Sequence, residues 1–261
     1  MLQPGPSTIL AIKGDLAVRL AASAGEIADA QKLRYRVFYE ELNARPDASA
    51  AAARIDADRF DGFCDHLIVT NGSELVGTYR LLRQDVAAAN GGFYTQGEFD
   101  ILPLIAAHPD LRFLELGRSC VLKPFRTRPV VELLWQGIWN YVRHHRLAVM
   151  LGCASLEGAD LDRHAAVLTF LARNCAAPVE WRVRAHAHRY VEMNRFPAAP
   201  VDVKAALKQL PPLIKGYLRL GCFIGEGAVI DEQFNTIDVL VVLPVSAIDT
   251  RYFAHFGKPS G

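Results

Sequence analysis

Apolar residues recur along the chain at spacings that predict helices and strands in alternation. The clearest helix is expected over residues 130–146, with Pro129 in its first turn, a position that proline favours. Its apolar side chains fall on one face and form a stripe: Val131, Leu134, Trp135, Ile138 and Val142. Further helices are predicted at 25–42, 161–174 and 202–210.

Alternating or continuous apolar runs predict the strands. HLIVT (66–70) and ELVGTYRLL (74–82) are expected to pair as a hairpin on Asn71-Gly72, a dipeptide typical of tight turns. Residues 44–62, rich in Ala and Asp, are expected to form a loop, and 84–112 show a mixed pattern. The remaining strands are predicted at 113–122, 147–155, 181–193, 220–230 and 237–243.

This order of elements predicts an α/β fold. No repeat or linker-like tract separates the elements. We therefore expect an N-terminal extension over 1–24, followed by a single domain over 25–261 with an elaborated C-terminal part.

Composition is that of a folded protein with balanced charge. The chain has 261 residues, of which 51% are hydrophobic and 22% charged, and its formal net charge is +1. These fractions are typical of a globular domain large enough to bury a sizeable core. A protein that binds nucleic-acid phosphates normally carries a larger positive excess, so no nucleic-acid partner is expected.

The cysteines and the apolar runs indicate a cytoplasmic location. The five cysteines, at 64, 120, 153, 175 and 222, are scattered and form no Cys-x-x-Cys motif, a pattern typical of buried thiols in a reducing compartment. The N-terminus MLQPGPSTIL lacks the basic and apolar regions of a signal peptide. The longest apolar run, near 239–248, is too short to span a bilayer.

One stretch, LELGRSCVLKPFRTRP (114–129), places charged residues inside a predicted buried strand. Glu115 and Arg118 are three residues apart, so a regular strand would send their side chains to opposite faces. A bulge at Gly117 would add one residue and bring both to one side, as happens next to many active sites. The alternative is an ion pair at the end of a strand.

A basic turn follows this strand and precedes the helix. Lys123, Arg126 and Arg128 lie where the helix would point its free backbone N–H groups, which makes the turn a plausible seat for a phosphate or pyrophosphate. The alternative is a solvated basic turn. Neither GxxxxGK[ST] nor GxGxxG follows any predicted strand.

Metal binding is not expected. Asp56-x-Asp58-x-x-Asp61-Gly62 resembles a calcium loop, but its third acid and its glycine come one position late. His186-x-His188 would place two imidazoles on one strand face without an evident third ligand.

Four segments carry a resemblance to a known family. RYRVF (34–38), DRFDGFCDHLIV (58–69), ELVGTYRLLR (74–83) and ELGRSCVLKPFR (115–126) resemble the GNAT-related acyltransferases that include acyl-homoserine-lactone synthases. Residues 135–160 and 210–230 resemble one branch more closely, the bacterial L-ornithine N(alpha)-acyltransferases of ornithine-lipid synthesis. The resemblance implies a GNAT-like fold, with a mixed central sheet, a splayed or bulged strand near Gly117 and flanking helices.

The resemblance also implies a reaction, in which a 3-hydroxyacyl chain passes from acyl carrier protein to the α-amino group of L-ornithine without a cofactor. Glu115 would be the base, and Arg118 would hold Glu115 or bind the substrate carboxylate. Substrate-binding roles would fall to Arg34, Phe38, Asp58, Asp61 and Arg80. In this set, Asp58 and Asp61 could hold the second ammonium group of ornithine, while Arg34 and Arg80 suit a carboxylate or order the loop. The donor would be bound by Lys123, Arg126 and Arg128.

Two departures from the related enzymes limit the alternatives. The lactone synthases usually have a tryptophan after the first helix, where this chain reads Glu41-Leu42-Asn43-Ala44. The GNAT phosphate loop usually contains glycines, which 126–129 lack. The alternatives are a lactone synthase, a coenzyme A-dependent N-acetyltransferase, or a non-catalytic module that binds carrier protein or lipid.

Residues 210–220 mix apolar side chains with Lys215 and Arg219, which suits peripheral contact with a membrane. The alternative is a helix or strand that packs on the core.

Overall fold

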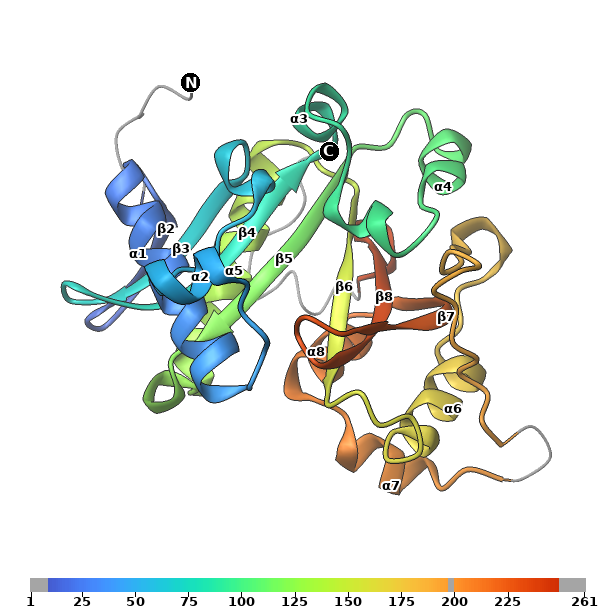
Figure 1. The fold of residues 1–261 in the computed structure, drawn as a ribbon. Helices are drawn as coiled ribbons and strands as arrows, with labels where there is room; N and C mark the ends of the chain where they lie inside the picture. The colour runs from blue at the N-terminus through green and yellow to red at the C-terminus, as the bar shows by residue number, and fades with distance from the viewer. Residues whose placement is uncertain (1–8, 197–199, 249–261) are drawn as a thin grey trace. The chain divides into compact units, whose positions relative to one another are not determined.

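The computed structural model describes residues 9–196 and 200–248 and shows the expected α/β fold (Figure 1). The chain divides into two compact units. The first contains the described residues 9–92 and 114–146, and the second contains 93–113 and the described residues from 147 onwards.

The first unit is built on five strands that pair antiparallel in chain order: β1 (Ile9–Lys13), β2 (Leu16–Leu20), β3 (Asp65–Asn71), β4 (Glu74–Arg83) and β5 (Phe113–Val121). Its helices are α1 (Ala24–Tyr35), which continues as a π-helical turn over Arg36–Glu41, and α2 (Ala48–Ala53), α3 (Gln84–Ala89) and α5 (Arg128–His144). A short 3₁₀ turn, Arg59–Gly62, precedes β3.

The two faces of this sheet have different partners. Gly137 of α5 lies so close to the sheet that a Cβ added there would come within 2.7 Å of Val18 and 3.0 Å of Leu67. Strand alternation places His66, the residue before Leu67, on the opposite face, where its ring contacts the backbone carbonyl of Asp61. Helix α5 therefore covers one face, and the aspartate-rich loop lies on the other.

The second unit contains three strands that pair antiparallel in the order β6-β8-β7: β6 (Val149–Glu157), β7 (Phe223–Asp231) and β8 (Thr236–Pro244). Its helices are α4 (Leu102–Ala107), α6 (Ala165–Asn174), α7 (Val203–Gln209) and α8 (Pro212–Arg219). Ile214 and Tyr217 of α8 are buried, so the segment that the sequence offered for membrane contact packs at least partly on the protein. Within 9–196 and 200–248, none of the helices combines the length and apolarity needed to cross a bilayer.

The N-terminal part of the chain contains two strands that the sequence pattern did not predict. Residues that we set apart as an extension form β1 and β2, a hairpin closed by Gly14-Asp15 that adds two strands to the first sheet. The second hairpin, β3–β4, is confirmed with its turn one residue later than predicted. Asn71 pairs with Glu74, and Gly72 occupies the turn with a φ of 57°, a conformation that glycine adopts at little cost.

The prediction of a strand over 181–193 is wrong. Only isolated β-bridges form there, and they connect the segment to two different parts of the chain. Ala185 bridges to Phe99, whereas Arg184 and Val191 bridge to Glu226 and Ala228 of β7. The segment is therefore shared between two partners and cannot build a continuous ladder with either.

The helix predicted at 130–146 forms as α5, but its buried face is rotated. Val131, assigned to the apolar stripe, is 47% exposed, whereas Val130 and Leu133 are buried. The stripe included Leu134, Ile138 and Val142 correctly. Small Gly137 sits at the closest approach to the sheet and carries no apolar side chain, so the pattern of large residues alone did not locate the centre of the buried face.

Candidate active site

Strand β5 carries a bulge at the predicted position. Arg80 pairs with Gly117 and Thr78 pairs with Cys120, so β5 has one residue more than β4 between these two pairs. Arg118 takes up the extra length in a left-handed conformation with a φ of 51°. A non-glycine residue rarely adopts this conformation, and such outliers cluster at functional sites.

The register also fixes the direction of Glu115. Leu82 pairs with Glu115 and Arg80 pairs with Gly117, and residues two apart in a strand share a face. Glu115 therefore points to the same face as Arg80, the face opposite α5. Glu115 is buried, with 5% of its surface exposed.

Arg34 of α1 forms the centre of a buried ion network on this face. Its two terminal nitrogens each donate a hydrogen bond of 2.8 Å to an oxygen of Asp61, in the bidentate geometry that suits a guanidinium and a carboxylate. Its Nε lies 2.9 Å from Asp56 Oδ2, an ion pair without hydrogen-bond alignment. Arg34 is 1% exposed, so the network replaces its hydration almost completely.

Arg80 and Arg118 complete the network from β4 and β5. Arg80 Nη1 donates to Asp58 Oδ1 at 2.6 Å and to Asp61 Oδ1 at 3.3 Å. Arg118 Nη2 donates to Asp58 Oδ2 at 3.1 Å, and its Nε lies 3.2 Å from Asp56 Oδ2. Three arginines thus meet three aspartates, and the formal charges of these six side chains cancel.

The aspartates also build the loop that holds them. Asp58 accepts a hydrogen bond from the backbone N–H of Phe60 at 2.8 Å, and Asp61 accepts one from the backbone N–H of Asp58 at 2.9 Å. This reciprocal arrangement is a capping box on the 3₁₀ turn. Burial alone would raise the pKa of Asp61, but Arg34 and Arg80 outweigh burial and hold that pKa well below its usual range.

Asp56 is a member of the network that the sequence analysis missed. It appeared only as the first acid of a rejected calcium pattern, yet it contacts both Arg34 and Arg118 and accepts a hydrogen bond of 3.1 Å from the Tyr39 hydroxyl. The sequence signal for Asp56 was the presence of three aspartates within six residues. A loop that supplies carboxylate ligands to a metal ion would show the same spacing.

Glu115 and Phe38, the two other residues predicted for catalysis and acceptor binding, lie in different environments. Glu115 lies near the network, because its charge and that of Arg80 both act on the Cys64 thiol, whose pKa burial raises to about 12. Phe38 lies on the π-helical turn and packs against an apolar cluster that contains Val37 and Cys120. Interruptions of this kind in helices are frequent at functional sites.

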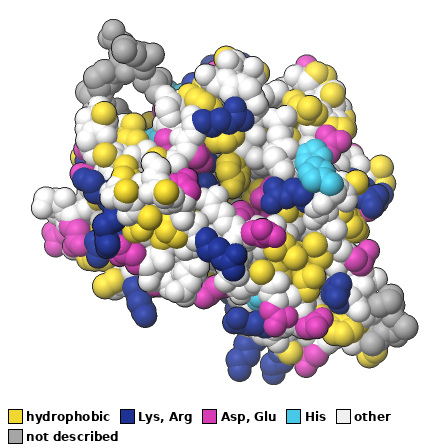
Figure 2. All heavy atoms as spheres, viewed as in Figure 1, with side chains coloured by type: hydrophobic (Ala, Val, Ile, Leu, Met, Phe, Trp, Pro, Cys, Tyr) yellow, Lys and Arg dark blue, Asp and Glu magenta, His cyan; other side chains and the backbone are white. Residues whose placement is uncertain are grey.

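The three predicted donor residues are exposed, and two of them pair with glutamates. Arg126 makes a bidentate pair with Glu41, at 2.5 and 2.8 Å. Arg128, 90% exposed, pairs with Glu132 one turn along α5, and Lys123 lies exposed in the preceding 3₁₀ turn. Figure 2 shows one face of the molecule, on which Lys and Arg side chains are interspersed with Asp and Glu side chains.

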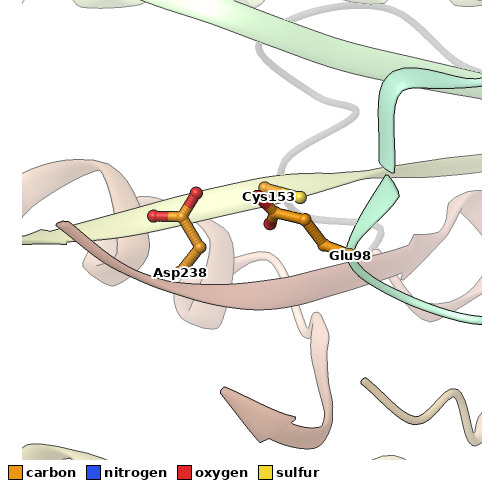
Figure 3. A group of neighbouring side chains, drawn as sticks. All are labelled: Glu98, Cys153 and Asp238. Atoms are coloured by element: carbon orange, nitrogen blue, oxygen red, sulfur yellow. The ribbon is translucent and has the colours of Figure 1, made fainter. Parts of the chain in front are cut away.

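The second unit holds an acidic group that the sequence analysis did not identify. One carboxylate oxygen of Glu98, one carboxylate oxygen of Asp238 and the sulfur of Cys153 all lie within 4.8 Å of one another (Figure 3). Burial raises the pKa of Glu98 to about 7, and the charge of Asp238 adds to this rise. The three residues come from the mixed stretch 84–112 and from two predicted strands, so proximity in sequence gave no signal.

Comparisons with known proteins identify the family. Residues 33–136 match the model of the acetyltransferase (GNAT) domain. This match confirms the expected GNAT-like fold, and the register of β4 and β5 confirms the bulged strand. An L-ornithine N(alpha)-acyltransferase of Agrobacterium fabrum is 51% identical, covering 94% of this chain and 86% of the relative. One of Brucella abortus is 49% identical, covering 97% and 92%. An N-acyl amino acid synthase from uncultured soil microbes aligns structurally with a TM-score of 0.49 at 13% identity, covering 88% of this chain and 91% of that one. The chain is an acyltransferase and belongs to the L-ornithine N(alpha)-acyltransferase family.

Proposed function

We propose that the protein transfers a 3-hydroxyacyl chain from acyl carrier protein to the α-amino group of L-ornithine, the first step of ornithine-lipid synthesis. The observation that carries this proposal is the identity of about half of all residues to L-ornithine N(alpha)-acyltransferases over nearly the whole chain. The bulge in β5 supports it, because bulges often lie next to active sites and this one carries both Glu115 and Arg118.

In the proposed reaction Glu115 accepts a proton from the acceptor amine. An α-amino group has a reference pKa of about 7.7–8.0, so it is largely protonated near neutral pH and needs a base. The free amine attacks the thioester carbon, a C–N bond forms, and a backbone N–H of β5 stabilises the developing oxyanion. As the C–S bond breaks, the nitrogen gives its second proton to the leaving thiolate, and Glu115 releases the proton that it holds to water.

We assign Arg118 a positioning role in this reaction. It ties the bulge of β5 to Asp56 and Asp58, and through them to the loop that Arg34 and Arg80 also hold. Each of the six carboxylate oxygens of Asp56, Asp58 and Asp61 has a hydrogen-bond or ion-pair partner. The network would therefore hold the residues that face the acceptor in one conformation.

Glu115→Gln tests the role of Glu115 as the base. This variant keeps the shape of the side chain but loses its basicity, so kcat should fall by roughly 10²–10⁴. The loss should be partly relieved at high pH, where more of the amine is already deprotonated. Product formation from 3-hydroxyacyl carrier protein and a panel of amino acids would be followed by mass spectrometry, with the exposed Glu74→Gln as the control.

Three results would contradict the proposal. Full activity of folded Glu115→Gln would favour a purely structural carboxylate. Acyl transfer to S-adenosylmethionine with release of a lactone would indicate a lactone synthase. Failure to acylate any amino acid would favour a module that binds carrier protein or lipid without catalysis.

The donor site is tested by charge reversal in the basic turn. Acyl carrier proteins are acidic, so Lys123, Arg126 and Arg128 would steer them by electrostatic attraction. Arg128→Glu is the cleanest variant, since Arg128 is 90% exposed and its i,i+4 pair with Glu132 contributes little to stability. The KM for acyl carrier protein should rise, more steeply at low salt, while Arg54→Glu at the exposed residue just after α2 should leave it unchanged. A rise in the ornithine KM alone would place these residues at the acceptor site.

A further inference from the structure

Helix α7 of the second unit exposes apolar and basic side chains on one surface. Ala206, and Leu210 just after the helix, are buried and hold α7 on the unit. Val203 is 43% exposed and Leu207 is 41% exposed. Residues four apart lie on the same side of a helix, so these two apolar side chains are neighbours. Exposed Lys204 and Lys208 follow them at the next position in each turn.

Helix α8 extends this surface with two more basic side chains. Lys215 Nζ donates a hydrogen bond of 3.0 Å to the backbone carbonyl of Lys208, so its ammonium lies at the C-terminal end of α7. Arg219 is exposed and lies one turn further along the same side of α8. The opposite side of α8 packs inwards through Ile214 and Tyr217. The α7–α8 surface is defined here by six residues: Val203, Lys204, Leu207, Lys208, Lys215 and Arg219.

The positive charge of the α7–α8 surface is not compensated locally. The sequence contains no Asp or Glu from 203 to 225. Within 9–196 and 200–248, none of its four basic side chains forms an ion pair, whereas Arg126 and Arg128 of the basic turn both pair with glutamates. The acid before α7, Asp202, accepts a hydrogen bond of 3.0 Å from the backbone N–H of Ala205 and so caps the helix. Four uncompensated cations indicate an anionic partner.

The exposed apolar side chains indicate which anionic partner fits. A basic helix surface that also exposes aliphatic groups matches the interface of a bilayer that contains anionic lipid. Lysine side chains have long apolar stems, so their ammonium groups can reach lipid phosphates while Val203 and Leu207 enter the layer beneath. A highly charged protein surface would attract the lysines but would give these two side chains little apolar contact.

We propose that the α7–α8 surface docks the protein on a bilayer that contains anionic lipid. The docking is peripheral and involves the second unit by itself. It differs from contact through 210–220, because Ile214 and Tyr217 of that segment are buried and the exposed apolar groups lie on α7. The docking goes beyond the proposed transfer reaction but suits its product, because an amino acid that has received an acyl chain is an amphiphile and partitions into a bilayer.

The test is flotation of the whole protein with phosphatidylcholine vesicles, with or without phosphatidylglycerol and in the absence of substrates. We expect the wild-type protein to float only with the anionic vesicles and to be released by salt. Lys204→Gln/Lys208→Gln should weaken binding about 25-fold, since each basic residue near an anionic surface contributes roughly fivefold. Leu207→Gln should weaken it roughly tenfold without changing its salt dependence.

The matched control removes two positive charges from the first unit. Lys32→Gln/Arg54→Gln changes two exposed side chains, each paired with an acid, and should leave vesicle binding unchanged. An equal loss in this control would show attraction by net charge alone and would overturn the docking surface.

The remaining outcomes separate the docking surface from the proposed function. Failure of the wild-type protein to bind anionic vesicles would overturn the surface. If, in addition, Lys204→Gln/Lys208→Gln raised the KM for acyl carrier protein, the four cations would belong to a protein-binding site instead. Vesicle binding that depends on Lys204, Lys208 and Leu207, without formation of any acyl product, would support the docking surface and contradict the proposed transfer reaction.

Discussion

Replacing Glu98 by glutamine should make the stability of the protein less dependent on pH. Burial and the charge of Asp238 raise the pKa of Glu98 from 4.5 to about 7 in the folded protein. Between these two values the folded state holds a proton that the unfolded state has lost, so the free energy of unfolding falls as pH rises through this window. At about 1.4 kcal/mol for each tenfold change in the proton equilibrium, the loss amounts to about 3 kcal/mol.

Glu98→Gln keeps the shape of the side chain and cannot ionise. We therefore expect the variant to match the wild-type protein near pH 4.5 and to exceed its free energy of unfolding by up to about 3 kcal/mol at pH 8. Urea unfolding at both pH values, without amino-acid ligand, measures this difference. Exposed Glu226→Gln is the control for loss of one carboxylate in the same unit. A stability difference between Glu98→Gln and wild type that is the same at both pH values would refute the reasoning.

Two further predictions concern the first unit. Asp61→Ala should lower the free energy of unfolding by about 3–5 kcal/mol in urea titrations, because it leaves the guanidinium of Arg34, 1% exposed, without its bidentate partner; a loss below about 1 kcal/mol would show that the remaining aspartates suffice. Gly137→Ala should lower the melting temperature, because crowding against Val18 and Leu67 costs about 1–3 kcal/mol and outweighs the gain in helix propensity of about 1 kcal/mol. Adding Val18→Ala should restore part of the loss, and a Gly137→Ala protein more stable than wild type would contradict the close packing.

Local patterns predicted the parts of the fold that depend on local interactions. The β3–β4 hairpin follows from a tight-turn glycine, Gly72, between two apolar runs, and α5 follows from its periodicity. The β1–β2 hairpin had an equivalent signal in Gly14-Asp15, between two short apolar runs, and was overlooked because it precedes the first helix. The segment 181–193 alternates like a strand, but its backbone partners are divided between β7 and the segment around Phe99, and alternation does not reveal how partners are divided.

The sequence predicted which residues lie in the candidate site better than it predicted how those residues pair with one another. The sequence pointed to the bulge at Gly117 because a glycine separates two charged residues three apart, and the register confirms it. The arginines and aspartates were expected to bind substrate or to order the loop, and the structure pairs them with one another. The proximity of Glu98 to Asp238 could not be predicted, because 140 positions separate them in the chain and only the folded strand β8 brings them together.

The ion pairs that Arg34 and Arg118 make with the aspartate loop have a consequence for the order of folding. Its partner Asp61 follows 27 residues later, whereas the arginine that spans Asp56 and Asp58 comes from position 118, about 60 residues after them. A growing chain can therefore pair Arg34 with the loop well before Arg118 has been synthesised. Until then the loop carries excess negative charge, and water stabilises it better than the sheet does. We expect the loop to close only when β5 docks on β4, so the face that carries Glu115 and the ion network would be the last part of the first unit to become protected against hydrogen exchange.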